Sequence, residues 1–379
     1  MLVDHAVPAW ARPYLEGEVT AGLSDVGEVI AAVAEFTDEH PVSGLVAYDP
    51  RRAGPVAGLA QHLGLPGNAP AAVTACQDPA RAHCLLEDHG VPSAQSHTVG
   101  DEAGAVTVAQ QLRFPVALKA ADTGDRARAD STDEVRAEFR TMCEDNTAAP
   151  HMVTVEQFGP TVGVEVVIVS PDDVRTIAVT RVDARPALAS SPLGYSVDAY
   201  DELLHDAALT RLVAQAVTAL GLTIGVVHAQ VRLTPRGPRL LQVSAGPADD
   251  LIPLLVDRAT GINLARAAAA LATGAVPDLS PTRERACAIR FLYPDATGRL
   301  VRRKAPAAFT AQPWLDRFAW TQQTGNTVLG PPLSDTEDRL AHWVVTGADS
   351  AECDVRLGRI GEQVTARISR NTSSPVSAL

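Results

Sequence analysis

Two glutamines occupy matching places on two neighbouring predicted strands. The stretch GVVHAQVRLTPRGPRLLQV (225–243) reads as two strands joined by a Thr-Pro-Arg-Gly-Pro turn, with Gln230 on the first strand and Gln242 on the second. Carboxylates in such facing positions are common protein ligands of Mg²⁺. An amide can form hydrogen bonds there, but it carries no charge. Acids at both positions would make a metal site, and two amides do not.

Five other side chains have the chemistry to contact a polar ligand: Lys119, Glu156, Phe158, Glu165 and Arg232. Each also has a purely structural alternative. Lys119, one of two lysines in the chain, ends a predicted strand and could simply face solvent. The two glutamates alternate with apolar residues, so a solvated strand face explains them equally well. Phe158 fits a core position, and Arg232 could form an ion pair with a residue on the opposite strand of the hairpin.

Two other chemistries find little support in the sequence. Ser244 follows a strand as a hydrolase nucleophile does, but the first glycine of GxSxG is missing and no partner histidine is evident. The ten histidines include no HExxH or other metal-ligand spacing.

The composition narrows the class of protein. The chain has 379 residues, 46% of them apolar, which predicts two to four domains with sizeable cores. A net charge of −13 argues against sequence-independent binding of nucleic acid. No apolar run approaches the roughly 20 residues of a membrane span, and no secretory signal is visible. Five scattered cysteines without a CxxC pair indicate free thiols in a cytoplasmic protein.

The elements that position these side chains follow from hydrophobic periodicity and from helix start and stop signals. Asp78 with Pro79 starts one helix, Ser131 with Glu134 caps another, and Gly261 breaks a third. We expect strands at 42–50, 114–119, 151–158, 162–170, 173–183 and 286–294, helices at 53–67, 78–90, 102–113, 131–145, 200–220 and 250–274, and a mostly β, turn-rich region to about residue 369.

Taken in order, several stretches resemble the ATP-grasp superfamily, and more narrowly its carboxylate–amine ligases. They are FPVALKAAD, VEQF, the 225–243 hairpin, DLIPLLVDRATGINLARAAAALATG and ACAIRFLYP. The resemblance implies an α/β fold in which two α+β lobes grip ATP. It predicts a short doubly wound domain at 1–95, a small lobe at 96–160, a large lobe at 161–285 and a β-rich extension at 286–370, followed by a disordered tail at 371–379.

The resemblance also implies what the site residues do. Active members phosphorylate a carboxylate with ATP, and an amine then attacks the acyl phosphate, with Mg²⁺ bridging the phosphates. In the family, a glutamate stands on each hairpin strand and an asparagine follows two places after the second. Here these metal positions hold Gln230, Gln242 and Ser244. The hairpin is therefore predicted to be a metal site that has lost its charges.

Other family positions for the nucleotide have changed as well. Pro79 stands where a lysine commonly approaches the phosphates, and Thr161 stands where a glutamate holds the ribose. The glycine-rich loop reads AADTGDRARAD, with Gly124 as its single glycine and with Arg126 and Arg128 added. The resemblance leaves Lys119, Glu156, Phe158 and Glu165 as nucleotide-binding candidates and Arg232 as the catalytic candidate, while Tyr195 replaces a histidine often seen in the substrate region.

The loss of two negative charges at the predicted metal positions favours a loss of ordinary ligase chemistry. Two unit charges at 4 Å interact by roughly 4 kcal/mol in a protein-like dielectric, and a dication doubles this before desolvation. We therefore expect weak or absent binding of ATP and Mg²⁺. The favoured hypothesis is a protein of a specialised-metabolite pathway that acts by binding a small carboxylate or amino acid, or as the partner of an active ligase. The alternative is an active ligase that forms an amide or peptide bond through an acyl phosphate.

Overall fold

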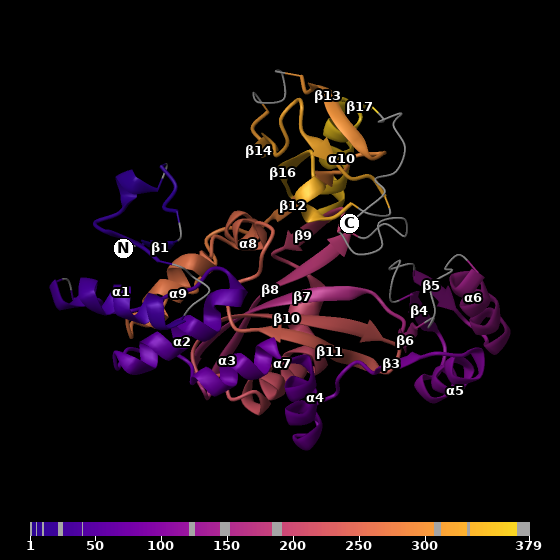
Figure 1. The fold of residues 1–379 in the computed structure, drawn as a ribbon, viewed down its shortest axis with the longest axis horizontal. Coiled ribbons are helices and arrows are strands. Elements are labelled where there is room, and N and C mark those ends of the chain that lie inside the picture. Colours follow the sequence, from indigo (N-terminus) through magenta and orange to yellow (C-terminus); the bar gives the residue numbers. More distant parts are fainter. Residues whose placement is uncertain are drawn as a thin grey trace.

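The computed structural model describes residues 2–4, 6–9, 11–21, 26–39, 41–120, 126–144, 152–183, 192–306, 312–331 and 334–369. Its centre is an antiparallel sheet of eight strands, which run in the order β11-β10-β7-β8-β9-β12-β16-β14 (Figure 1). These are β11 (Gly237–Ser244), β10 (Gly225–Thr234), β7 (Thr161–Ser170), β8 (Asp173–Asp183), β9 (Gly194–Asp198), β12 (Ala286–Leu292), β16 (Ala341–Gly347) and β14 (Leu315–Trp320).

Helices cover both faces of this sheet. On one face, α7 (Ala207–Ala219) packs on alternate residues of β7 and β10, among them Val164 and Val227. On the other face, α8 (Ile252–Thr260) and α9 (Leu264–Ala272) pack on the opposite set, which includes Val226. The predicted break between these two helices is confirmed, because Gly261 ends α8 with a φ of 80°.

A separate four-stranded sheet forms the small lobe at the right of Figure 1. Its strands lie in the order β3 (Ser96–Val99), β6 (Val153–Gln157), β4 (Val116–Ala120) and β5 (Arg126–Ala129). Helices α5 (Glu102–Leu112) and α6 (Thr132–Glu144) bury one face of it around Leu118 and Val155. The other face of this sheet carries Lys119 and Glu156.

The N-terminal region is helical and its sheet is small. Strands β1 (Leu2–Asp4) and β2 (Glu18–Thr20) pair in parallel, and helices α1 (Val26–Glu39), α2 (Ala53–His62), α3 (Pro70–Gln77) and α4 (Pro79–Asp88) follow. The predicted strand at 42–50 is wrong: residues 41–47 form no strand, and a 3-10 turn begins at Pro50. This segment runs against the end of α9 instead, where a Cβ on Gly44 would meet the Ala272 carbonyl oxygen at 2.4 Å.

The C-terminal region contains more helix than predicted. Beside the three-stranded sheet of β13 (Gly298–Lys304), β15 (Thr327–Val328) and β17 (Thr365–Ser369), helix α10 (Ser350–Gly361) packs on β12 and β16. Asp349 caps α10 by accepting a hydrogen bond from the Glu352 backbone N–H. The predicted disordered tail at 371–379 lies outside the described residues.

Both connections into the small lobe are fixed to the β10–β11 hairpin. On the way in, the Ala94 N–H donates to the Leu240 carbonyl (2.7 Å), and the Leu240 N–H donates to Pro92 (2.9 Å). On the way out, the Leu233 N–H donates to the Pro160 carbonyl (2.9 Å). The neighbouring Gly159 has no room for a side chain, because a Cβ there would lie 2.1 Å from the Leu233 carbonyl oxygen.

Candidate functional site

Four side chains form a rectangle on one face of the β10–β11 hairpin. Gln230 is the direct cross-strand partner of Gln242, and His228 is the partner of Ser244. Directly opposite residues project to the same face of an antiparallel pair, about 4.5–5.5 Å apart at Cβ. Both glutamines are exposed. The rectangle therefore presents two amides, a hydroxyl and an imidazole where the family resemblance places the metal ligands.

His228 is held from behind by a buried carboxylate. Its Nδ1 lies 2.8 Å from Oε1 of Glu165, which is fully buried and also accepts a hydrogen bond from the Thr180 hydroxyl at 3.1 Å. Gly163 makes room for the ring, because a Cβ there would lie 2.6 Å from Cε1 of His228. The alternative that Glu165 lies on a solvated face is wrong. Alternation along β7 assigned the glutamate to the correct face, but the His228 side chain covers it there.

Charge on Glu165 governs the protonation of His228. Burial of the imidazole acts to lower its pKa, but the charge and hydrogen bond of Glu165, with a smaller contribution from Asp249, raise the pKa above 6.5. Burial raises the pKa of Asp249, and the neighbouring carboxylates of Asp250 and Asp49 raise it further. His228 therefore stays protonated to a higher pH than a free imidazole does.

Arg232 connects the large lobe to the small lobe. Its Nη1 donates to the Gln157 carbonyl (2.6 Å) and lies 3.3 Å from Oε2 of Glu156. The alternative of a pair across the hairpin is wrong, because the residue opposite Arg232 is Arg239. Burial of Arg232 lowers the pKa of its guanidinium. The sequence pattern placed Glu156 and Arg232 in different motifs, and the structure joins them.

Lys119 and Phe158 lie at opposite ends of the β4–β6 pair of the small lobe, and Phe158 is at the end that leads into β7. Lys119 stands opposite Thr154 of β6, on the face turned away from the Leu118 core, and makes no ion pair within the described chain. The guanidinium of Arg128 lies 4.8 Å from the centre of the half-buried Phe158 ring. Residues 121–125 of the predicted phosphate loop, which include Gly124, lie outside the described residues, as does the side chain of Arg126, whereas the second half of that stretch forms strand β5.

A cavity of about 280 Å³ lies between α4 and β11 and is lined by both Pro79 and Gln242. Two positions at which the chain departs from the family pattern are therefore close together in space. Pro79 takes the first position of α4, as predicted, and the Asp78 side chain caps the helix by accepting from the N–H groups of Ala80 and Arg81.

The substrate-region residue Tyr195 belongs to a polar cluster. Its hydroxyl donates to Asp250 at 3.1 Å, and the guanidinium of Arg339 binds the same carboxylate through two nitrogens. Arg339 also lies 3.7 Å from the centre of the Phe291 ring. This cluster satisfies its own charges and joins the large lobe to the C-terminal region.

Sequence reasoning missed His228. Its signal was its position two residues before Gln230, which places both side chains on one strand face. Among residues that the structure describes, no group of three or more His, Cys, Asp and Glu side chains is arranged to hold a metal ion. Within the same residues, no helix is long and apolar enough to cross a membrane.

Comparison with solved structures identifies the fold. L-amino acid ligase from Bacillus licheniformis superposes with a TM-score of 0.71 over 94% of this chain and 89% of its own, at 18% identity. Phosphoribosylglycinamide synthetase from Anaerococcus prevotii gives a TM-score of 0.70 over 97% and 92%, at 16% identity. The chain has the ATP-grasp fold. Biotin carboxylase from Campylobacter jejuni shares this ATP-grasp arrangement less closely, with a TM-score of 0.58 at 13% identity, over 94% of this chain and 83% of its own.

Sequence comparison adds one relative. The uncharacterized protein y4rH of Sinorhizobium fredii is 27% identical over 319 residues, which cover 82% of this chain. The chain spans 65% of the length of that relative. No family model matches the sequence.

Proposed function

We propose that this ATP-grasp protein binds a small carboxylate or amino acid without ordinary Mg²⁺-ATP ligase chemistry. We place it in a specialised-metabolite pathway, either as a binding protein or as the partner of an active ligase. The observation that carries the proposal is the direct pairing of Gln230 with Gln242 on the exposed face of the hairpin. The strand pairing is that of an intact hairpin, and the substitution removes charge with little change in shape.

Electrostatics gives the size of the effect. A carboxylate 4 Å from a unit positive charge gains roughly 4 kcal/mol at an effective dielectric constant of 20, and a dication doubles that figure before desolvation. Two amides in place of two carboxylates therefore cost several orders of magnitude in metal affinity. Ser244, the third of these positions, contributes a hydroxyl and no charge.

The side chains that remain favour an anion. Lys119 lies on the face of the small-lobe sheet that is turned away from the Leu118 core, while the guanidinium of Arg128 lies over the Phe158 ring. We expect any residual nucleotide binding to depend on Lys119 and on the hinge strand with Glu156. Arg128 competes with an adenine ring for the face of Phe158 that it covers.

One observation favours the alternative of an active ligase. Arg232 of the large lobe contacts the hinge strand of the small lobe directly, and Lys119 lies on the face of the small-lobe sheet that also carries Glu156. An enzyme with relaxed metal dependence would need such cations to neutralise phosphate charge.

Calorimetry with Mg²⁺-ATP, with and without amino acids, tests the proposal. We expect a dissociation constant of about a millimolar or weaker. ADP release at about 1–100 s⁻¹ in the presence of amino acids would replace the proposal with the active-ligase alternative. Co-purification from the native host separates the two binding roles, because only the partner role predicts an intact ATP-grasp ligase in the same complex.

A further inference from the structure

Charge is distributed unevenly along the chain. The net charge is −13, yet residues 286–379 contain eleven Lys and Arg against nine Asp and Glu. The excess of negative charge therefore lies entirely in residues 1–285. Arg302, Lys304 and Arg367 belong to the three-stranded sheet of β15, β13 and β17, at the top of Figure 1.

The strand register places these three cations on one face of the sheet. Arg302 is the direct cross-strand partner of Arg367, and Lys304 is the partner of Thr365. Directly opposite residues, and residues two apart along a strand, project to the same face. All three cations are exposed, while the opposite face carries the fully buried Leu300. We call Arg302, Lys304 and Arg367 the cationic face.

No acid neutralises the cationic face. Within the part of the chain that the structure describes, none of its three side chains forms an ion pair or a hydrogen bond. The neighbouring Arg303, by contrast, lies 5.6 Å from the centre of the Trp320 ring. Like charges that stand directly opposite each other on two strands are destabilising. The pair of Arg302 and Arg367 therefore costs stability, and an anionic partner would relieve that cost.

Protection of a sheet edge explains only one of the three cations. Charged side chains on an edge strand prevent unwanted pairing with other chains. β17 is the edge strand here, but Arg302 and Lys304 lie on β13, between β15 and β17. Edge protection therefore accounts for Arg367 alone.

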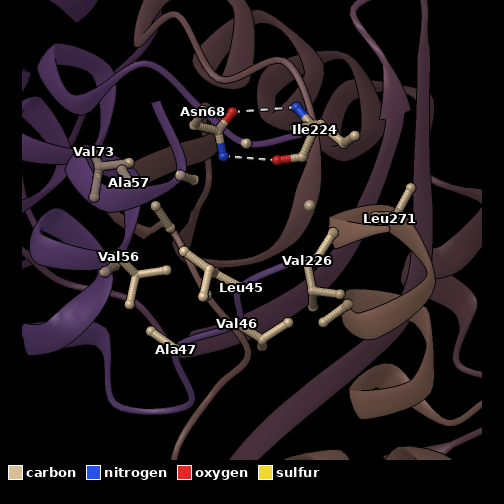
Figure 2. A pocket seen from close by; sticks show the side chains of 18 of the residues that line it. Leu45, Val46, Ala47, Val56, Ala57, Asn68, Val73, Ile224, Val226 and Leu271 are labelled. Carbon is tan, nitrogen blue, oxygen red and sulfur yellow. Dashed lines mark hydrogen bonds between the residues drawn. The ribbon is translucent and has the colours of Figure 1, made fainter. Parts of the chain in front are cut away.

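The cationic face is also separate from the cavities. The cavity between α4 and β11 has none of these cations in its lining, and neither has a second cavity of about 100 Å³ between the N-terminal helices and the large sheet. Figure 2 shows the second cavity, with Val56 on one side and Val226 on the other, and every residue that lines it is uncharged. The cationic face therefore fits a partner that lies on an open surface.

The edge of β17 favours an extended peptide as that partner. Among the described strands β17 pairs only with β13, so the backbone groups of its outer edge are available to a further strand. A peptide that adds to a sheet edge gains affinity from main-chain hydrogen bonds and specificity from alternate side chains. Alternate side chains of a strand are about 7 Å apart, which is also the spacing of Arg302 and Lys304 along β13.

We propose that β17 and the cationic face bind an extended acidic segment of a partner protein, with carboxylates at alternate positions. The segment pairs with the outer edge of β17, and its carboxylates accept hydrogen bonds from Arg367, Arg302 and Lys304. The net charge of −13 disfavours nucleic acid and anionic membranes, whose negative charge extends far beyond this small face. The inference goes beyond the proposed function, because it involves no residue of the β10–β11 hairpin.

Fluorescence anisotropy on the full chain tests the proposal with the labelled peptide Thr-Glu-Val-Glu-Val-Glu-Thr. Its isomer Thr-Val-Glu-Glu-Glu-Val-Thr is the matched control, because an extended strand presents only two of the three contiguous carboxylates to one face. We expect the alternating peptide to bind at about 100 µM or tighter, about fivefold tighter than the isomer, and more weakly as salt shortens the Debye length. Equal binding of the two isomers, or no binding of either, overturns the proposal.

Two double variants locate the peptide. Arg302→Gln with Arg367→Gln should weaken binding at least about tenfold. The melting temperature should not fall, because the change removes two like charges that face each other. Arg211→Gln with Arg266→Gln, at exposed positions of α7 and α9, removes the same charge elsewhere and should leave the affinity unchanged. Equal weakening in both variants would show that only the total charge matters, and would refute the site.

Other occupants of the cationic face give different results. A single-stranded DNA oligonucleotide or phosphatidylserine vesicles that bind wild type more tightly than the alternating peptide would contradict the proposal. Sedimentation velocity covers a second copy of the chain: self-association of wild type that disappears in Arg302→Gln with Arg367→Gln would also contradict it. None of these measurements uses ATP, Mg²⁺ or the hairpin, so their failure and the failure of the proposed function remain separate outcomes.

Discussion

Gln230 lies directly opposite Gln242, and the register of β10 against β11 shifts immediately after this pair, between Gln230 and Val231. The two amides therefore occupy the last regular step of the ladder before the strand continues toward Arg232. A bulge at this point turns the strand locally and re-aims its side chains. Carboxylates at these two positions would face each other directly, as the two amides do.

Restoring the charges should restore Mg²⁺ binding. In Gln230→Glu with Gln242→Glu and Ser244→Asn, near-isosteric changes leave the strand pairing intact. Mg²⁺ should raise the melting temperature of this triple variant and not of the wild type, by mass action on the folded state. In the absence of metal, the two close carboxylates repel, so the variant should be slightly less stable than the wild type near neutral pH. Differential scanning fluorimetry with and without Mg²⁺ measures both effects.

The matched control replaces residues outside the site, as in Gln61→Glu with Gln363→Glu, which adds the same charge without pairing it. That variant should show no Mg²⁺-dependent shift. Equal stabilisation of wild type and triple variant by Mg²⁺-ATP would contradict a site that has lost its acids. Ligase turnover should not return in the triple variant, because Pro79 still stands in place of the lysine.

Removal of Arg232 should destabilise the protein. Arg232→Ala breaks a buried contact with Glu156 and the Gln157 carbonyl, and loss of one partner of a buried pair costs about 3 kcal/mol. Urea titration measures the change in the free energy of unfolding. Arg175→Ala, at an exposed pair with Asp173, is the control and should have little effect.

The Glu165–His228 pair should make stability depend on pH. The pKa of His228 is raised above 6.5 in the folded protein, so the folded state binds its proton more tightly than the unfolded state does. The resulting stabilisation is fully present below pH 6.5 and is lost as the pH rises through the folded pKa. Wild type should therefore lose stability relative to His228→Gln over that rise. The exposed variant His83→Gln should follow the wild type; a difference between wild type and His228→Gln that does not change with pH would contradict the prediction.

The cysteines should differ sharply in reactivity. All five are free, as the sequence indicated. Burial raises the pKa of Cys76 and of Cys353 to about 12, which leaves almost no thiolate at neutral pH, whereas Cys84 is exposed on α4. Iodoacetamide followed by peptide mass spectrometry should label Cys84 well before these two, and label those two only after unfolding. Early labelling of Cys76 would show that α3 opens readily.

Local sequence signals were enough to predict many of the helix boundaries. Asp78 with Pro79 predicted the start of α4, and Gly261 predicted the break between α8 and α9, because caps and left-handed residues act within one helical turn. Residues 42–50 have the composition of a strand. A strand also needs a second strand to pair with, and the local sequence cannot show whether one is present. The same holds for the site. Alternation placed Glu165 on the correct face of β7, but its contact with His228 joins residues 63 positions apart.

The anchoring of both small-lobe connections has a mechanical consequence. Pro92 and Ala94 form hydrogen bonds with Leu240, and Pro160 forms one with Leu233. Both chain connections of the small lobe are therefore bonded to the same hairpin. Any swing of that lobe must pivot on β10 and β11, the strands that also carry His228, Gln230, Gln242 and Ser244. A ligand that stiffens the hairpin would thereby restrict the angle of the small lobe. Binding at β10 and β11 would then change the position of the small lobe relative to the large sheet.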